Sequence, residues 1–125
     1  MRFDAPVQCL YRIVTEDTFI GEIEIPEGSN IMLGWGTAGR DPKYFDNPNK
    51  FDLYRHNADK NVGFGFGPHI CVGLGLAKAE ARIAFETIFD RLKDINLDED
   101  ADLSHIPTFA TRGYKKLDLL FESNG

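Results

Sequence analysis

The clearest pattern along the chain is a helical one. Between residues 74 and 95, apolar side chains recur at spacings of three and four, at Ala77, Ala81, Phe85, Ile88, Leu92 and Ile95. This spacing places them on one face of a helix. The rest of the segment is rich in Ala, Leu, Glu, Lys and Arg, which favour helices. The pattern therefore predicts one long helix over residues 74–95.

Residues 11–35 follow a different pattern, in which apolar and polar side chains alternate. Ile23 and Ile25 alternate with glutamates, and Pro26 and Gly28 follow at positions typical of a type I turn. This stretch predicts two or three strands. Near the C-terminus, the sequence YKKLDLLFES of residues 114–123 predicts a further strand.

The segment between them, residues 36–66, has no regular period. Pro, Asn, Asp and Gly interrupt any helix or strand there. Its aromatic side chains, among them Phe45, Phe51 and Tyr54, are nevertheless too many for a solvated linker. We expect a long loop that packs against the rest of the protein.

Composition and charge narrow the class of protein. The chain has 125 residues, of which 42% are hydrophobic and 27% charged, as in an ordinary single globular domain. A net charge of −6 argues against a nucleic-acid-binding protein. No apolar run reaches the roughly 18 residues of a membrane span, no signal peptide is evident, and 2 cysteines are too few for a disulfide framework. We expect a cytoplasmic setting.

Candidate chemistry gathers just before the predicted helix, in the glycine-rich sequence FGFGPHICVGLG of residues 64–75. The dinucleotide-binding motif G-x-G-x-x-G is absent, because Ile70 stands where the third glycine would follow Gly65 and Gly67. The phosphate-binding Walker motif is absent too, since no GK[ST] occurs. Pro68 also removes an N–H group that a phosphate would need. Structural zinc requires four ligands, and no further His or Cys lies at a recognised ligand spacing from His69 and Cys71. Nucleotide and zinc sites are therefore disfavoured.

The remaining interpretation is that Cys71 serves as a single axial metal ligand. A thiolate near a metal requires N–H donors to stabilise it. Small residues on both sides allow the backbone to approach a large flat cofactor. A helix that begins directly after the cysteine directs its free N–H groups and the positive end of its dipole toward the sulfur. His69 could meet a carboxylate at the edge of the cofactor.

These residues resemble a known signature. The segment FGFGPHICVG is similar to the haem-ligating motif of the cytochromes P450, F-x-x-G-x-[RH]-x-C-x-G, and matches it at Phe64, Gly67, His69, Cys71 and Gly73. The following LAKAEARIAF resembles the helix of the family, with Lys78 where bacterial members commonly have arginine. Other segments of the family are resembled by GEIEIPEGSNIML, GRDPKYFDNPNKFDLYR and TRGYKKLDLLF.

The resemblance implies a haem b site. Cys71 would be the proximal ligand of the haem iron and the catalytic thiolate, with the ring of Phe64 near the sulfur. Arg12 and His69 would meet the two haem propionates. The further cofactor-binding residues implied are small ones, Gly65, Gly67, Gly73 and Ala77. Pro6 to Leu10 and Phe109 to Gly113 would form pocket wall.

The resemblance also implies the fold. We expect one α+β domain over residues 1–125, the C-terminal portion of the mainly α cytochrome P450 fold. It would comprise a β region (1–35), an irregular meander and cysteine loop (36–73), a long helix (74–95) and a C-terminal β-hairpin (96–125). Arg2 stands where the arginine of the E-x-x-R motif of the family would be. The chain would thus be a fragment without the oxygen-activating helix and most of the substrate pocket.

The implied function is that of a haem-thiolate monooxygenase, which activates O₂ and inserts one oxygen atom into a small organic substrate. A ferredoxin or a flavoprotein reductase would supply electrons, with Lys60, Lys78 and Arg82 as candidate contacts. We expect that this chain alone is not catalytically competent. The alternative is a catalytically inert remnant or an oligomerising interaction module, with or without haem, with the apolar helix face forming a homo-oligomer.

Overall fold

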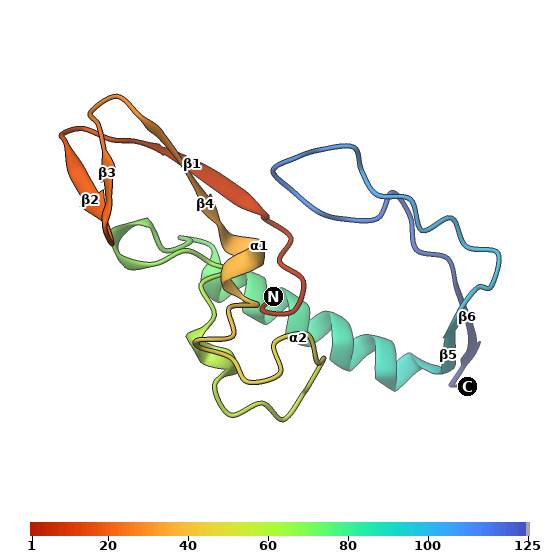
Figure 1. Ribbon diagram of the computed structural model, residues 1–125. Coiled ribbons are helices and arrows are strands. Elements are labelled where there is room, and N and C mark those ends of the chain that lie inside the picture. Colours follow the sequence, from red (N-terminus) through yellow and green to blue (C-terminus); the bar gives the residue numbers. More distant parts are fainter. Residues whose placement is uncertain (125) are drawn as a thin grey trace. The chain divides into compact units, whose positions relative to one another are not determined.

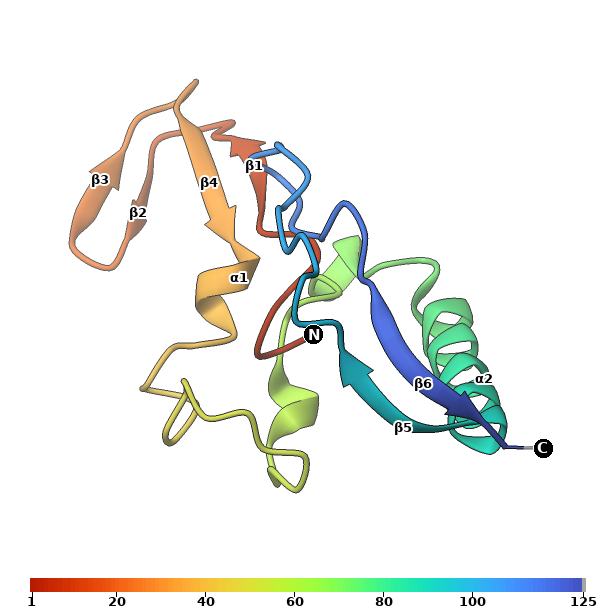
Figure 2. The same ribbon diagram turned by 90° about the vertical axis from the view of Figure 1, so that its right-hand side faces the viewer.

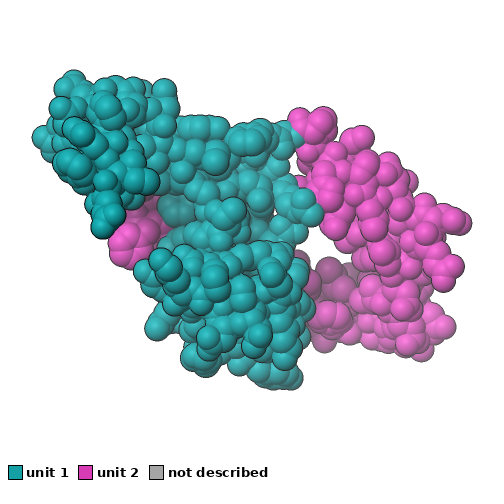
Figure 3. Space-filling view, viewed as in Figure 1, with its two compact units in different colours: residues 1–63, 108–112 teal, residues 64–107, 113–125 magenta. Residues whose placement is uncertain are grey.

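The computed structural model describes residues 1–124 (Figure 1). Contacts within the chain divide it into two compact units (Figure 3). The first comprises residues 1–63 and 108–112, and the second comprises residues 64–107 and 113–125. No helix within residues 1–124 is long and apolar enough to span a membrane.

The first unit contains two antiparallel strand pairs. Strand β1 (Cys9–Ile13) pairs with β4 (Asn30–Gly34), and β2 (Thr18–Ile20) pairs with β3 (Ile23–Ile25) (Figure 1). The alternating pattern predicted two or three strands from residue 11, whereas four form from residue 9. The number was underestimated because β2 and β3 have only 3 residues each, too few to separate two strands by pattern.

The turn before β4 also differs from the expectation. The N–H of Ser29 donates to the carbonyl of Pro26 at 3.2 Å, so the turn spans residues 26–29. Gly28 is its third residue, with φ +79°. A positive φ at that position is a feature of type II turns and not of the predicted type I turn.

The loop after β4 packs around the side chain of Arg2. A short helix, α1 (Trp35–Ala38), and a 3₁₀ turn, η1 (Ala58–Lys60), are its only regular elements within the first unit. The buried guanidinium of Arg2 donates to the carbonyl oxygens of Gly39 (2.7 Å), Pro48 (2.9 Å) and Lys50 (3.1 Å). It also lies 5.3 Å from the ring centroid of Phe45.

The loop therefore packs down as expected, but through few of its aromatic side chains. Phe45 is 2% exposed, whereas Tyr44, Phe51 and Tyr54 are largely exposed. The other buried apolar side chains of the described residues, Ala5, Cys9 and Val14, also belong to the first unit.

Residues 108–112 join the first unit by pairing with its N-terminal segment. The N–H of Gln8 donates to the carbonyl of Ala110 at 2.8 Å, and the N–H of Arg112 donates to that of Pro6 at 2.7 Å. The two segments that were expected to form pocket wall are thus neighbours.

The second unit contains the 3₁₀ turn η2 (Gly67–His69), helix α2 (Leu74–Arg91) and the antiparallel strands β5 (Leu92–Leu97) and β6 (Leu119–Ser123) (Figure 2). The C-terminal strand pair confirms the expected hairpin. It includes residues 92–95, which the sequence assigned to the helix.

The predicted helix therefore begins at the right residue but ends at Arg91 instead of residue 95. A bulge in β5 explains the error. The pairing with β6 shifts between Lys93 and Asn96, and Asp94 adopts φ +51°. The extra residue brings Leu92 and Ile95 to a similar, half-buried position although they are three apart. The three-residue spacing of Leu92 and Ile95 is therefore due to the bulge and not to a helix.

We expect Arg2→Met to lower the free energy of unfolding of the first unit by about 2–4 kcal/mol, because buried carbonyl oxygens lose a charged donor. Urea titration followed through Trp35, the 1 tryptophan of the chain, would measure this. Arg12→Met is the matched control, since Arg12 donates only an exposed hydrogen bond to Tyr11. Equal urea midpoints for the two variants would contradict the role of Arg2.

Candidate functional site

The loop that carries Cys71 is closed by backbone hydrogen bonds. The N–H of Cys71 donates to the carbonyl of Phe64 at 2.8 Å, and the N–H of Ile70 donates to that of Gly67 at 3.1 Å. The extended Phe66 leads into η2, which contains Pro68 in its first turn. Cys71 is therefore held at a fixed position relative to the start of the loop.

Two glycines allow this path. Gly65 has φ +81° and Gly67 has φ +60°, values that side chains other than glycine rarely adopt. A Cβ on Gly65 would lie 2.7 Å from the carbonyl oxygen of His69, so the loop also requires a close backbone approach there. A Cβ on Gly67 would meet no atom within 4 Å, so the space beside it is open.

The thiol of Cys71 lies at the N-terminal end of α2. It is free and exposed, and a Cβ on Gly73 would lie 3.8 Å from its sulfur. The carbonyl of Cys71 accepts from the N–H of Leu74 at 3.1 Å, and that of Gly73 accepts from Ala77 at 2.8 Å. No side chain of the described residues caps this helix end. Its free N–H groups and the helix dipole favour a nearby negative charge.

Apolar side chains around the cysteine face solvent. Phe66, Ile70, Val72 and Leu76 are all more than half exposed, and Phe64 is half-buried. Water rarely surrounds so many apolar side chains within one short segment of a folded protein. The segment therefore has the character of a surface that an apolar group covers.

All the candidate site residues except Arg12 belong to the second unit. Phe64, Gly65, Gly67, His69, Cys71, Gly73 and Ala77 form one continuous loop and first helical turn in the second unit. His69 is exposed at the end of η2. Arg12 lies in β1 of the first unit, where its guanidinium donates to the carbonyl of Tyr11 at 2.8 Å.

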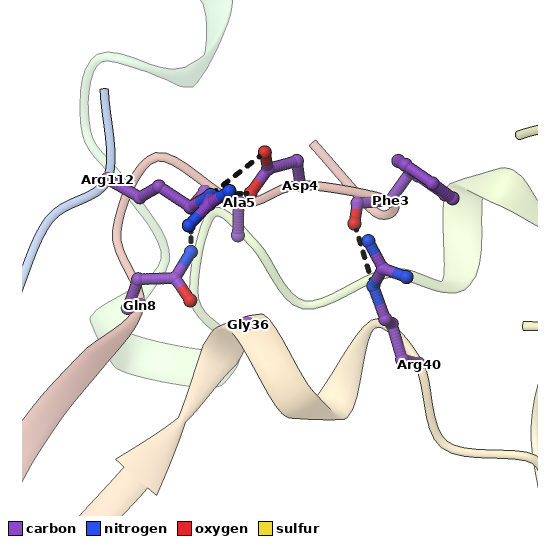
Figure 4. Close-up of a pocket in the computed structure, with 7 residues that line it drawn as sticks. All are labelled: Phe3, Asp4, Ala5, Gln8, Gly36, Arg40 and Arg112. Atoms are coloured by element: carbon purple, nitrogen blue, oxygen red, sulfur yellow. Dashed lines mark hydrogen bonds and ion pairs between the residues drawn. The ribbon is translucent and has the colours of Figure 1, made fainter. Parts of the chain in front are cut away.

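A polar pocket in the first unit was not predicted from the sequence (Figure 4). Within it, the guanidinium of Arg112 contacts the carboxylate of Asp4 at 3.1 Å, and that of Arg40 donates to the carbonyl of Phe3 at 2.9 Å. The lining comes from three separate segments, so no local motif marks it. Both arginines already have partners, which favours a structural role in joining these segments.

We expect alanine substitutions of the loop glycines to differ in cost. Gly67→Ala meets only the positive φ and should destabilise the second unit by about 1–2 kcal/mol. Gly65→Ala adds the overlap with His69 and should cost more, whereas Gly75→Ala, in open space within α2, should be neutral or slightly stabilising. Hydrogen exchange of the Cys71 amide, measured by NMR, would rank the three variants by how often the loop opens, because this amide donates to Phe64. Equal protection in the Gly65 and Gly67 variants would contradict this account of the loop.

Comparisons with known proteins address the whole chain. The family model for cytochrome P450 matches residues 1–112. The chain is 36% identical over 122 residues to the biotin biosynthesis cytochrome P450 of Bacillus subtilis. The aligned region covers 98% of this chain and 30% of that relative. It is 39% identical over 97 residues to cytochrome P450-terp of a Pseudomonas species, covering 78% of this chain and 22% of the relative.

Solved structures agree with this assignment. Substrate-free CYP150A6 of Mycobacterium marinum superimposes with a TM-score of 0.95 at 34% identity, over 99% of this chain and 32% of that one. P450BioI in complex with a fatty-acid-ligated acyl carrier protein gives a TM-score of 0.91 at 36% identity, over 97% of this chain and 31% of that one. The chain thus spans about a third or less of the length of these proteins. By sequence and by fold over nearly all of its residues, this chain belongs to the cytochrome P450 family.

Proposed function

We propose that this chain carries the haem-thiolate site of a cytochrome P450-type monooxygenase, with Cys71 as the proximal ligand of the iron of haem b. The observation that carries the proposal is the position of the Cys71 thiol, which is free and exposed at the uncapped N-terminus of α2. This position lies within the residues matched by the family model.

The residues around Cys71 fit one face of a haem. A Cβ on Gly67 or Gly75 would meet no atom within 4 Å, so the backbone is open to a flat macrocycle on this side. The exposed side chains of Phe66, Ile70 and Leu76 supply apolar surface for it. A thiolate is a suitable donor for haem iron. The donor type, the open space and the apolar surface are thus mutually consistent.

Each candidate residue would have a defined task. Cys71 would bind the iron as thiolate, and the free N–H groups at the start of α2 would stabilise its negative charge. The half-buried ring of Phe64 would pack near the sulfur. His69 and Arg12 would pair with the propionates, since two cationic groups suit two carboxylates.

When bound, the haem would supply O₂ activation and the insertion of one oxygen atom into a substrate, as Cys-ligated haem does in this family. The contribution of this chain would be to hold the group, to tune its charge through the thiolate, and to provide part of the substrate pocket. Residues 6–10 and 109–113 would line that pocket, and the hydrogen bond between Gln8 and Ala110 supports their adjacency.

The substrate would be a small organic molecule with substantial apolar surface. P450BioI binds a fatty acid on an acyl carrier protein, and CYP109E1 of Bacillus megaterium binds testosterone and corticosterone. These ligands share apolar bulk and differ in shape, which favours an apolar class without selecting one member. A ferredoxin or a flavoprotein would supply the electrons.

A second candidate function is that of an inert interaction module. Helix α2 contains no buried residue, and the chain matches only 30% of the Bacillus subtilis relative. The family resemblance implies that the acid–alcohol pair and the distal pocket belong to other parts of the family's fold than the one these residues match. These observations favour the alternative for the 125-residue chain when it is studied by itself.

We expect the purified chain to bind added haemin through Cys71. After reduction with dithionite under carbon monoxide, the wild type should give a red-shifted Soret band that Cys71→Ala lacks. Cys9→Ala is the matched control, because Cys9 is buried in β1 and should leave the band unchanged. Far-UV circular dichroism would establish that both variants remain folded. A wild type without this band would refute thiolate ligation of haem by this chain.

We also expect the haem-loaded 125-residue chain to show no oxygenase turnover. A panel of fatty acids and steroids with a surrogate ferredoxin system would be analysed for hydroxylated products by mass spectrometry. The reference is free haemin with the same donors. Product formation above this reference would contradict the expectation, and it would favour an active enzyme over the inert module.

A further inference from the structure

Helix α2 ends without the left-handed glycine that commonly closes a helix. Its C-cap residue Leu92 is extended, with φ −124° and ψ 142°, so the chain passes directly from the helix into β5. The N–H of Leu92 makes the last helical hydrogen bond, to the carbonyl of Ile88. The carbonyl groups of residues 89–91 therefore need donors from outside the helix.

Asn124, which directly follows β6, donates to all three of these carbonyls. Its side-chain Nδ2 donates to the carbonyl of Asp90 at 3.1 Å and to that of Phe89 at 3.5 Å. Its backbone N–H donates to the carbonyl of Arg91 at 2.7 Å. The end of β6 lies beside the end of α2 for this reason (Figure 2). Only an amide side chain suits this position, because the part of Asn124 that contacts the helix must donate hydrogens.

The same side chain is chemically unstable. Asparagine is a thermolabile residue, because the backbone nitrogen of the next residue can attack its side-chain carbonyl carbon. The next residue in the sequence is Gly125, and no other asparagine of the chain precedes a glycine. A glycine has no Cβ to shield the attacking nitrogen. Asn124 thus combines the most reactive sequence context with a structural task for its amide.

We propose that Asn124 is a site of spontaneous deamidation, and that its conversion removes the C-terminal cap of α2. A bond forms between the backbone nitrogen of Gly125 and Cγ of Asn124. The bond from Cγ to Nδ2 breaks, and Nδ2 leaves as ammonia together with the proton of the attacking N–H. Water then opens the resulting cyclic imide and leaves a carboxyl group. The reaction needs no oxidant or reductant.

The product does not fit the position that the amide occupied. A carboxylate accepts hydrogen bonds and donates none, so the carbonyls of Phe89 and Asp90 lose their donor. It also places a negative charge at the negative end of the helix dipole. Lys93 of β5 already pairs with Glu122 at 3.3 Å. The junction between α2 and β5 should therefore open more often after conversion.

The hydrogen bonds of Asn124 also control its conversion. While Nδ2 donates to the helix, the side chain is held away from the geometry that attack requires, so the reaction proceeds through local opening. Each conversion is irreversible and favours further opening. Haem binding plays no part in it, since Cys71 precedes the other end of α2, and either proposal can fail without the other.

Peptide mass spectrometry of the 125-residue chain, aged without haemin at mildly alkaline pH, would test the reaction. We expect the small mass gain from the exchange of an amide for a carboxyl group to appear at Asn124 before any other asparagine. Gly125→Val keeps the amide of Asn124 but shields the attacking nitrogen, and should suppress the mass gain. An Asn124 that persists while other asparagines convert would overturn the proposal.

Hydrogen exchange measured by NMR would test the structural consequence. In Asn124→Asp, the amide of Leu92 should exchange roughly tenfold faster, because the neighbouring carbonyls lose a donor and face a negative charge. The amide of Ala77, near the other end of α2, should keep its rate. Asn49→Asp is the matched control, since the Asn49 side chain accepts a hydrogen bond from Arg40 in the first unit and a carboxylate still accepts.

Aged wild-type protein should show the same faster exchange at Leu92, in proportion to the converted fraction. This second sample keeps the test decisive if Asn124→Asp fails to fold, which far-UV circular dichroism would reveal. Unchanged exchange at Leu92 in fully converted protein would contradict the role of Asn124 as the cap of α2.

Discussion

The hydrogen bond from the N–H of Cys71 to the carbonyl of Phe64 is the constraint on which the candidate site depends. It joins the start of the glycine-rich loop to Cys71, three residues before α2 begins at Leu74, and so holds the thiol near the positive end of the helix. The bond can form because Gly65 and Gly67 accept positive φ values and because Gly65 has no Cβ to meet His69. Glycine content, thiol position and helix start are thus one structural feature.

The first unit depends on a different interaction, the buried guanidinium of Arg2. Its hydrogen bonds to the carbonyls of Gly39, Pro48 and Lys50 organise a loop that has almost no regular structure of its own. Burial, followed by repulsion from Arg55 and Arg40, lowers the pKa of Arg2 below that of a free guanidinium. The charge is held because backbone carbonyls compensate part of the lost hydration.

Local sequence patterns predicted those features that depend on neighbouring residues. The start of α2 at Leu74 and the grouping of the loop residues followed from helical spacing and from one contiguous motif. The end of α2 at Arg91 did not, because the bulge at Asp94 gives Leu92 and Ile95 a spacing that a helix would also show. The pocket of Arg40 and Arg112 was missed because its lining joins residues distant in sequence. Arg12, which the resemblance assigns to a haem propionate together with His69, lies in the other unit, and its task stays a prediction.

The most direct measurement of the central claim is X-ray absorption spectroscopy at the iron edge of the haem-loaded chain, which reports the atoms bound to iron without any need for turnover. The account predicts one sulfur neighbour in addition to the four porphyrin nitrogens in the wild type, and its loss in Cys71→Ala. An iron surrounded only by nitrogen and oxygen in the wild-type chain would contradict a haem-thiolate site at Cys71.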